Sequence, residues 1–576
     1  MEPRSAATFR GFWWPLAAIL PAAAIFAPAI GFDFVYDDRG QVVDTTQLET
    51  WRNIPSFFTG HVWSWLMPAS LSNYYRPGFK LWLFANYTLF ARDAPGWHLA
   101  TLAAHLVAIF MVYRLALLVT GAPGVSAFAA ALFGVDPVHL GNVAPISGVA
   151  DVLVTIFWIA AILCYRRARE PGAGSRFLWS AAAVALYAAS VFTKEVGIVL
   201  PAILTVFEWI FGNRESASPD APRRARGMLP LFLPFAAVAA AYLATRVRVI
   251  HAITIVLTPV SLGRMILTWP SMLLFYLKHL VWPLHLGLFY VLPVATRTDY
   301  RLYAIPAAIL ALIGAALWPA VRASRVIAFG LAWMALTLAP VFYLRGMVPG
   351  DFLSDRYLYV PSIGFCLIVA ELGSMLARGT VVRAVAAAVA VALMAAATLA
   401  QEFAWESNAS LFARAVEISP DSAAANRWMG YTLFTRGAAA EAVGYDRRAV
   451  ELDPLDGNAS YELGLTYYSL GMLPEADPYF VRAIRLEPQD ARPFLYLGLT
   501  RMGSDRLADA QLLIAEALRR RGRDTPRGCH QAMGEVLERM GKSTAALAEY
   551  RAEFRENPDN DYVRRKIAAL DGMSPR

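Results

Sequence analysis

Two adjacent carboxylates, Asp37 and Asp38, stand in the stretch FVYDDRG, directly after the first long apolar segment of the chain. A carboxylate pair at the rim of a membrane body can act as a general base toward a hydroxyl, as a metal ligand, or as both. One such pair alone is also what a solvated helix end contains. The pair therefore predicts chemistry only if other functional side chains gather around it.

Three further loops carry ionisable or polar side chains between apolar segments. Several such groups that converge on one face of a membrane body predict a site, because each of them is costly to place near lipid. We therefore expect these loops to gather beside the carboxylate pair. The loops are 136–151 with His139, Asn142 and Asp151, 193–195 with Lys194 and Glu195, and 345–356 with Asp351, Asp355 and Arg356.

The elements that must position these residues are membrane spans. Of the 576 residues, 57% are apolar, whereas soluble domains contain about 45–50%, and the excess lies before residue 400. Since a span needs roughly 20 apolar residues, the sequence predicts an all-α polytopic bundle of about eleven spans in residues 1–400. The spans are expected near 12–31, 98–118, 124–135, 150–165, 177–192, 196–211, 229–245, 303–320, 326–343, 357–376 and 380–400.

The arginine clusters predict the orientation of this bundle. Clusters near 166–176, 214–226, 322–325 and 378–383 alternate with the acidic loops, and Lys and Arg favour cytoplasmic loops. This places the N-terminus in the cytoplasm and the acidic loops outside. This alternation of arginine clusters and acidic loops holds only if the segment 266–284 does not cross the membrane. That segment contains Lys278, His279 and two prolines, and we expect it to be a re-entrant or interfacial helix. If that segment crosses instead, the C-terminal region moves to the cytoplasm.

Residues 401–576 have a different composition and a 34-residue period. A period of this length with small residues and a proline at fixed places is typical of tetratricopeptide repeats, in which small residues let two antiparallel helices pack closely. We expect this α-solenoid to offer a groove to a peptide or protein, or else to serve assembly. The periodic sets are Pro420, Pro454 and Pro488, Gly430, Gly464 and Gly498, and Ala442, Ala476 and Ala510.

Six motifs in a fixed order carry a resemblance to a known family. They are FVYDD, NYYRPGF (73–79), GWHLATLAAH (96–105), LFGVDPVHLGNVAPISGVADVL (132–153), FTKEVGIVLP (192–201) and SDRYLYVPSIGF (354–365). Together with the repeats after them, they resemble the transmembrane and tetratricopeptide-repeat family of protein O-mannosyltransferases and its bacterial relatives. The resemblance implies an inverting glycosyltransferase of the polytopic GT-C type. It would move sugar from a polyprenyl-phosphate donor to a hydroxyl, often of protein Ser or Thr, outside the cytoplasm.

The resemblance also implies roles for named residues. Asp37 or Asp38 would be the base that takes the acceptor proton, and would hold a divalent metal if one is used; no cofactor follows for certain. Arg76, Lys194 and Arg356 would bind the leaving phosphate. Cations stabilise its charge, and an arginine can contact a phosphate through two hydrogen bonds. His139 would bind sugar hydroxyls or donate a proton, or would cap a turn, and Arg356 could instead pair with Asp355 or Asp351. The donor-site candidates are Arg76, His139, Asp151, Lys194, Glu195, Arg356 and Tyr357.

The chain departs from the family pattern at four positions. The family commonly has His-Pro-x-His-x-Glu where this chain has Asp136 and Gly141 at the outer positions, and it often has Arg where this chain has Val149. The acid before Arg356 is Asp355, where the family usually has Glu. These departures bear on sugar identity and donor contacts more than on the reaction class.

Two other classes of function fit parts of the pattern. One is a non-catalytic membrane scaffold whose repeats assemble an envelope complex. The other is a transporter of lipid-linked sugars, although a transporter places ionisable groups in the middle of its spans. The excess of Arg over Lys suggests a GC-rich bacterium. With the predicted topology, we therefore expect a protein of the bacterial inner membrane with periplasmic repeats, and nucleic acid is not an expected partner. A chain that ends after Glu402 is expected to keep the donor site.

Overall fold

The computed structural model describes residues 5–66, 72–170, 174–212, 221–348, 352–377, 379–520 and 527–572. In these residues every regular element is helical and no strand occurs, which confirms the all-α prediction. The chain divides into two compact units, Met1–Arg414 and Ala415–Arg576. Asp351 and parts of the arginine clusters near 214–226 and 378–383 lie outside the described residues.

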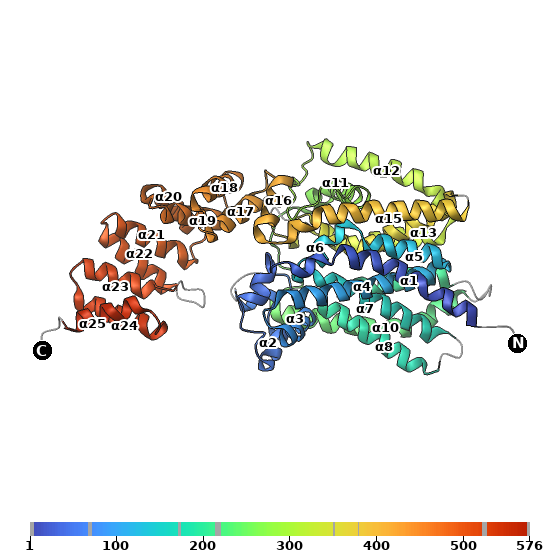
Figure 1. Ribbon diagram of the computed structural model, residues 1–576, viewed down its shortest axis with the longest axis horizontal. Helices are drawn as coiled ribbons and strands as arrows, with labels where there is room; N and C mark the ends of the chain where they lie inside the picture. Colours follow the sequence, from blue (N-terminus) through green and yellow to red (C-terminus); the bar gives the residue numbers. More distant parts are fainter. Residues whose placement is uncertain are drawn as a thin grey trace. The chain divides into compact units, whose positions relative to one another are not determined.

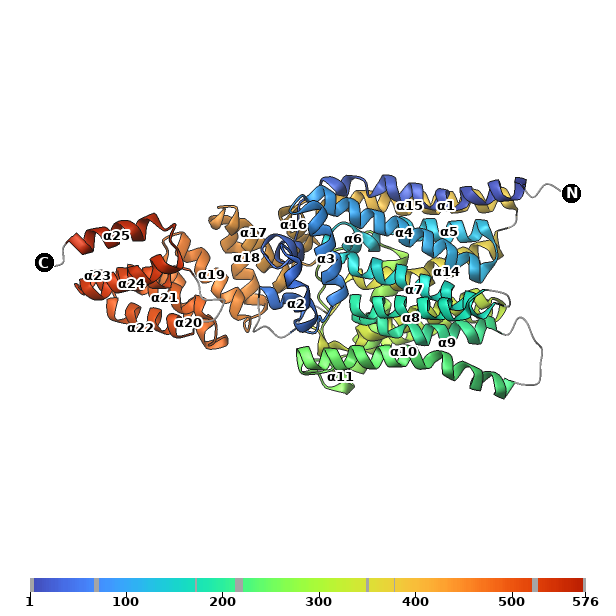
Figure 2. The ribbon, with the colours of Figure 1, turned by 90° about the horizontal axis from the view of Figure 1, so that it is seen from below.

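The first unit is a bundle of long apolar helices that run side by side (Figures 1 and 2). Within the described ranges, nine helices are long and apolar enough to cross a membrane, and a bent pair makes ten if it is one span. The chain is therefore a multi-pass membrane protein. The nine include α1 (Ser5–Ile25), α4 (Ala94–Thr120), α7 (Val149–Arg169), α8 (Arg176–Thr193), α10 (Ala221–Ile250), α12 (Tyr300–Ala323), α13 (Arg325–Leu338), α14 (Tyr359–Leu376) and α15 (Thr380–Glu402).

Two predicted spans are short helices in the structure. The first is α5 (Pro123–Gly134), which continues after a bend of 51° into Pro137–Val143. The second is α9 (Leu200–Phe211), which has 12 residues and follows a 3-10 turn at Glu195–Val199. Because a 3-10 turn rises about 2.0 Å per residue, the turn and α9 together rise about 28 Å, close to the roughly 30 Å of a hydrocarbon core.

Side-chain contacts show that this second segment runs the length of the bundle. Lys194, just before the turn, binds Asp151 in the first turn of α7 at 2.6 Å. Glu208, near the end of α9, binds Arg169 in the last turn of α7 at 3.1 Å. The 3-10 turn thus lengthens a segment that has too few residues to span as an α-helix.

α11 (Leu262–Val281) covers most of the segment predicted to be re-entrant or interfacial. It has 20 residues, yet it is not one of the candidate spans in the described part of the chain. Its charged residues Arg264 and Lys278 lower its hydropathy. The side of the membrane on which it lies stays a prediction.

The second unit consists of antiparallel helix pairs (Figure 1), as the 34-residue period predicts. The periodic glycines let each pair approach closely, since a Cβ on Gly464 would lie 2.9 Å from the Phe480 ring and one on Gly498 2.6 Å from Ile514. This confirms a tetratricopeptide solenoid. Its helices are α17 (Ala423–Thr435), α18 (Ala439–Leu452), α19 (Gly457–Ser469), α20 (Leu473–Leu486), α21 (Ala491–Gly503), α22 (Leu507–Arg519), α23 (Cys529–Arg539), α24 (Ser543–Glu556) and α25 (Asp561–Gly572).

A buried carboxyl in this solenoid predicts a pH-dependent stability. Asp446 in α18 accepts a hydrogen bond from Thr466 at 2.7 Å, and its other oxygen lies where a Cβ on Gly430 would stand. Burial raises the pKa of Asp446 to about 7. A raised pKa in the folded state means that this group stabilises the fold below pH 4 and that the contribution is lost as the pH rises toward 7.

We therefore expect the stability of Asp446→Asn to depend less on pH. Between pH 4.5 and pH 7.5 the unsubstituted unit should lose on the order of 2 kcal/mol of unfolding free energy that the variant keeps. Urea denaturation of the C-terminal unit expressed alone measures this, because repeat units fold on their own contacts. An identical pH dependence of the two proteins would contradict the prediction.

Candidate active site

Asp38 is a buried acceptor of backbone hydrogen bonds. Its carboxylate accepts the N–H groups of Ile146 at 3.1 Å and of Ser147 at 2.7 Å, and its side chain is fully buried. Burial raises the pKa of Asp38 to about 6, although these N–H groups favour the charged form. Asp38 therefore joins the loop after α1 to the turn before α7.

Asp37 has a different environment. Its Oδ2 lies 3.7 Å from Nη1 of Arg356, and the two side chains are 21% and 24% exposed. Tyr36, the residue before it, has a left-handed backbone with φ of 49°. The adjacent carboxylates therefore have different surroundings: backbone N–H groups enclose Asp38, and Asp37 is partly exposed beside a cation.

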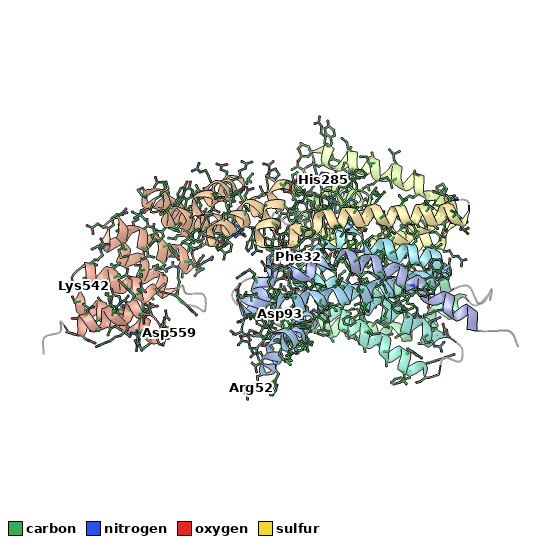
Figure 3. All side chains as sticks on the ribbon, in the orientation of Figure 1. Phe32, Arg52, Asp93, His285, Lys542 and Asp559 are labelled. Carbon is green, nitrogen blue, oxygen red and sulfur yellow. The ribbon has the colours of Figure 1, made fainter. Side chains whose placement is uncertain are left out.

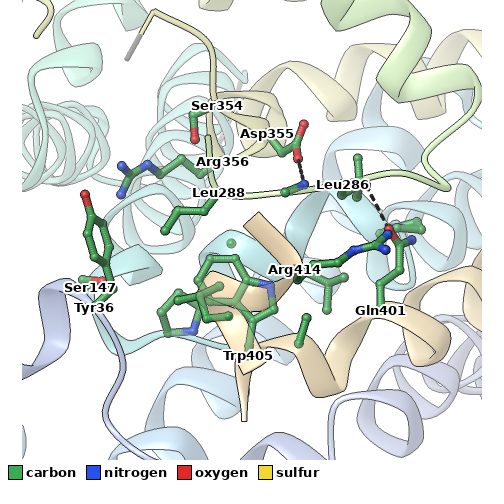
Figure 4. Close-up of a pocket in the computed structure, with 17 residues that line it drawn as sticks. Tyr36, Ser147, Leu286, Leu288, Ser354, Asp355, Arg356, Gln401, Trp405 and Arg414 are labelled. Carbon is green, nitrogen blue, oxygen red and sulfur yellow. Dashed lines mark hydrogen bonds between the residues drawn. The ribbon is translucent and has the colours of Figure 1, made fainter. Parts of the chain in front are cut away.

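Arg356 lines a cavity of about 30 Å³, here named the Arg356 cavity. Figure 4 shows Arg356, Tyr36 and Ser147 on one side of it, and Gln401 and Arg414 on the other. The alternative in which Arg356 pairs with Asp355 is wrong. The Asp355 carboxylate accepts hydrogen bonds from the Tyr290 hydroxyl and from the Gly287 N–H.

A second cavity, of about 180 Å³, holds most of the predicted donor-site residues and is here named the Lys194 cavity. Two ion pairs form its polar wall. Arg76 contacts Glu195 through two hydrogen bonds of 2.5 and 2.8 Å, and Lys194 contacts both oxygens of Asp151 at 2.6 and 2.7 Å. Its other wall is largely apolar and includes Pro340, Val341, Tyr343, Met347, Val360 and Pro361.

The ion pairs decide the charge of this cavity. Glu195 accepts two hydrogen bonds from the Arg76 guanidinium, which balances its charge. Burial lowers the pKa of Lys194, and Asp151 opposes that shift. Since two cations face two carboxylates here, an anion that enters has to compete with the carboxylates.

Asn142, for which no role was predicted from the sequence, links residues that line the two cavities. Its amide donates to Asp151 at 2.9 Å and to the Arg356 carbonyl at 3.2 Å. Arg356 and Tyr357 are neighbours in the 3-10 turn η11 (Asp355–Leu358). Arg356 lines one cavity and Tyr357 the other. The sequence feature that could have pointed to Asn142 is its place in the polar loop between His139 and Asp151.

Comparison with known proteins finds relatives along most of the chain. No family model matches. Human protein O-mannosyl-transferase TMTC4 is 25% identical over 486 residues, 75% of this chain and 66% of the relative. Mouse TMTC3 is 25% identical over 448 residues, 71% and 48%, and F38B6.6 of Caenorhabditis elegans is 25% identical over 435 residues, 72% and 59%. The chain is thus similar, over most of its length, to proteins named protein O-mannosyl-transferases. It spans about half to two thirds of the length of these relatives.

Solved structures match the repeat region at low overall similarity. YrrB, a tetratricopeptide-repeat protein with an unusual peptide-binding site, is 20% identical, with 28% of this chain and 82% of YrrB covered and a TM-score of 0.25. MamA of Desulfovibrio magneticus RS-1 is 20% identical, with 26% and 84% covered and a TM-score of 0.24.

Position 141, where the TMTC family commonly has Glu, faces Arg356. A Cβ on Gly141 would lie 3.5 Å from Cβ of Arg356 and 3.6 Å from the Trp405 ring. A side chain there would enter the Arg356 cavity, which Gly141 itself lines. Asp37 lies beside Arg356, 3.7 Å from its Nη1 atom.

His139 lies apart from both cavities. It is fully buried, its Nε2 lies 2.8 Å from the Ser362 hydroxyl, and its ring packs 4.4 Å from the rings of Phe133 and Tyr359. It lines neither cavity. We therefore leave His139 out of the site proposed below.

The carboxylates of the site do not form a metal-binding group. Among the residues that the structure describes, no three His, Cys, Asp or Glu side chains are close enough together to hold a metal ion. Asp37 and Asp38 face different partners, so the pair does not present two carboxylates to one ion. The reaction proposed for this chain uses no metal.

Proposed function

We propose that this chain is a membrane glycosyltransferase that moves a sugar from a polyprenyl-phosphate-linked donor to a hydroxyl of a protein Ser or Thr. The names of its relatives favour mannose as the sugar. The observation that carries the proposal is the accessible Asp37, 3.7 Å from Arg356, which lines the Arg356 cavity. Asn142 ties the backbone of Arg356 to Asp151 in the wall of the Lys194 cavity. A base and a cation at this separation can serve an attacking hydroxyl and a leaving phosphate together.

In the proposed reaction Asp37 accepts the proton of the acceptor hydroxyl as its oxygen attacks the anomeric carbon. The new carbon–oxygen bond forms as the bond from that carbon to the phosphate oxygen breaks, and the polyprenyl phosphate leaves with the electron pair. One displacement inverts the anomeric configuration. Arg356 stabilises the charge that grows on the phosphate.

Arg356 is the best candidate of the three predicted cations for this role. Arg356 lies 3.7 Å from Asp37, the proposed base, whereas the carboxylates beside Arg76 and Lys194 are Glu195 and Asp151. Arg76, Lys194, Glu195, Asp151 and Tyr357 then shape the Lys194 cavity around the sugar phosphate. The apolar wall of that cavity suits an isoprenoid chain.

The sidedness follows from the charge pattern. We place the N-terminus in the cytoplasm, the candidate site and the repeats in the periplasm, and the chain in a bacterial inner membrane. Residues 1–400 would carry the reaction, and residues 401–576 would recruit the acceptor.

The experiment is a transfer assay with full-length protein in liposomes. We expect mannose from mannosyl-phosphoryl-polyprenol to appear on a Ser/Thr-rich acceptor protein, in a linkage that alkali removes by β-elimination. GDP-mannose in place of the lipid donor should give no product. Label that crosses the bilayer without transfer would indicate the transporter, and neither transfer nor transport would indicate the scaffold.

A further inference from the structure

The backbone just before the proposed base is strained. Tyr36 has a φ of 49°, a left-handed conformation that non-glycine residues adopt at a conformational cost. Such a conformation persists only where surrounding contacts hold it, and it is enriched at functional sites. The strain matters because this turn sends Asp37 toward Arg356 and Asp38 toward the backbone of residues 146–147.

The contacts that hold Tyr36 come from the segment after the last span. Oδ1 of Asn408, in α16 (Asn408–Ile418), accepts the Tyr36 N–H at 2.8 Å. The Phe412 ring, one turn later, meets the Tyr36 ring edge-on at 5.9 Å. Both contacts reach across more than 370 residues of sequence, so the local sequence around Tyr36 does not supply them.

The same segment is anchored on the loop that leads to Tyr36. The Asp33 N–H donates to the Glu406 carbonyl at 3.0 Å. The Phe32 ring lies 5.9 Å from the Phe403 ring, and Phe32 is labelled in Figure 3. Trp405 and Arg414 of this segment line the Arg356 cavity together with Tyr36 (Figure 4).

We infer that residues 403–414 are a positioning element of the active site, in which Asn408 holds the Tyr36 backbone so that Asp37 faces Arg356. The inference rests on the proposed function and adds to it a residue outside the predicted site. Asn408 touches neither reacting group and acts through Tyr36. The functional boundary of the membrane unit thus lies after Arg414, where the compact unit ends, and a chain cut after Glu402 would lose the element.

The test compares three full-length variants in the transfer assay. Asn408→Ala removes the acceptor of the Tyr36 N–H, whereas Asn408→Asp keeps an oxygen in its place. Glu441→Gln, in α18, is the matched control, because its side chain is exposed and it lies outside residues 403–414. We expect Asn408→Ala to lower kcat at least tenfold with the donor KM within twofold. Asn408→Asp and Glu441→Gln should keep at least half of the kcat of the unsubstituted protein.

Hydrogen exchange supplies a readout that does not depend on activity. In Asn408→Ala the peptide that contains Tyr36 should exchange at least tenfold faster, while peptides of α4 and α7 exchange as in the unsubstituted protein. Unchanged exchange at Tyr36, a kcat within twofold, or equal losses in the Ala and Asp variants would overturn the inference. Asp37→Asn, assayed in parallel, separates the two proposals: full turnover there refutes the proposed base, whereas an inactive Asp37→Asn beside an active Asn408→Ala refutes only the positioning role.

Discussion

Asp37→Asn is expected to lower the rate of sugar transfer by on the order of 10²–10⁴-fold, the usual contribution of a general base. The amide cannot accept the proton of the attacking hydroxyl. The protein should still insert and should keep its melting temperature within a few degrees, because Asp37 is partly exposed and its contact with Arg356 is long, at 3.7 Å. Transfer rates at saturating donor, with melting curves in the same detergent, measure both quantities.

Asp38→Asn is the control for this prediction, since it makes the same chemical change one residue away. Asp38 accepts two backbone N–H groups in a fully buried site, and hydrogen bonds to charged groups contribute about 1.5–3 kcal/mol. An Asn there offers one oxygen and a competing N–H₂ group. We therefore expect a clear fall in melting temperature for Asp38→Asn. Equal activity of Asp37→Asn and unsubstituted protein would rule out Asp37 as the base.

Lys194→Met is expected to destabilise the membrane unit by about 3–5 kcal/mol, because it leaves a buried carboxylate without its cation. The side chains of Lys194 and Asp151 are only 10% and 7% exposed, and they contact at 2.6 Å. The double variant Lys194→Met/Asp151→Leu should recover most of this loss, since an apolar pair can replace a buried ion pair. Thermal unfolding in detergent measures the three proteins.

The same variants separate stability from donor binding. In the double variant we expect the donor KM to stay raised at least tenfold although the fold has recovered, because the polar wall of the Lys194 cavity is gone. Arg92→Met is the matched control: its pair with Glu49 is about half exposed at both ends, so its loss should cost less than about 1 kcal/mol. A Lys194→Met protein that melts like the unsubstituted one would show that the pair adds nothing to stability.

Much of the architecture could be predicted from the sequence because its signals are local. Apolar length marks the spans, and a 34-residue period with glycines that admit Phe480 and Ile514 marks the solenoid. The segment 196–211 shows where such a signal weakens: its helix has 12 residues, and only its contacts to both ends of α7 reveal that it runs the length of the bundle.

From the sequence alone, an all-α membrane protein with tetratricopeptide repeats could be predicted, together with the loops in which polar site candidates would lie. The partners of these residues became visible only in the fold. It buried Asp38 and left Asp37 beside Arg356, paired Lys194 with Asp151, and brought Asn408 to Tyr36. The physical reason is that hydrophobic period and span length are properties of neighbouring residues. The partner of a polar atom, in contrast, depends on how segments more than 40 and up to 372 residues apart pack together.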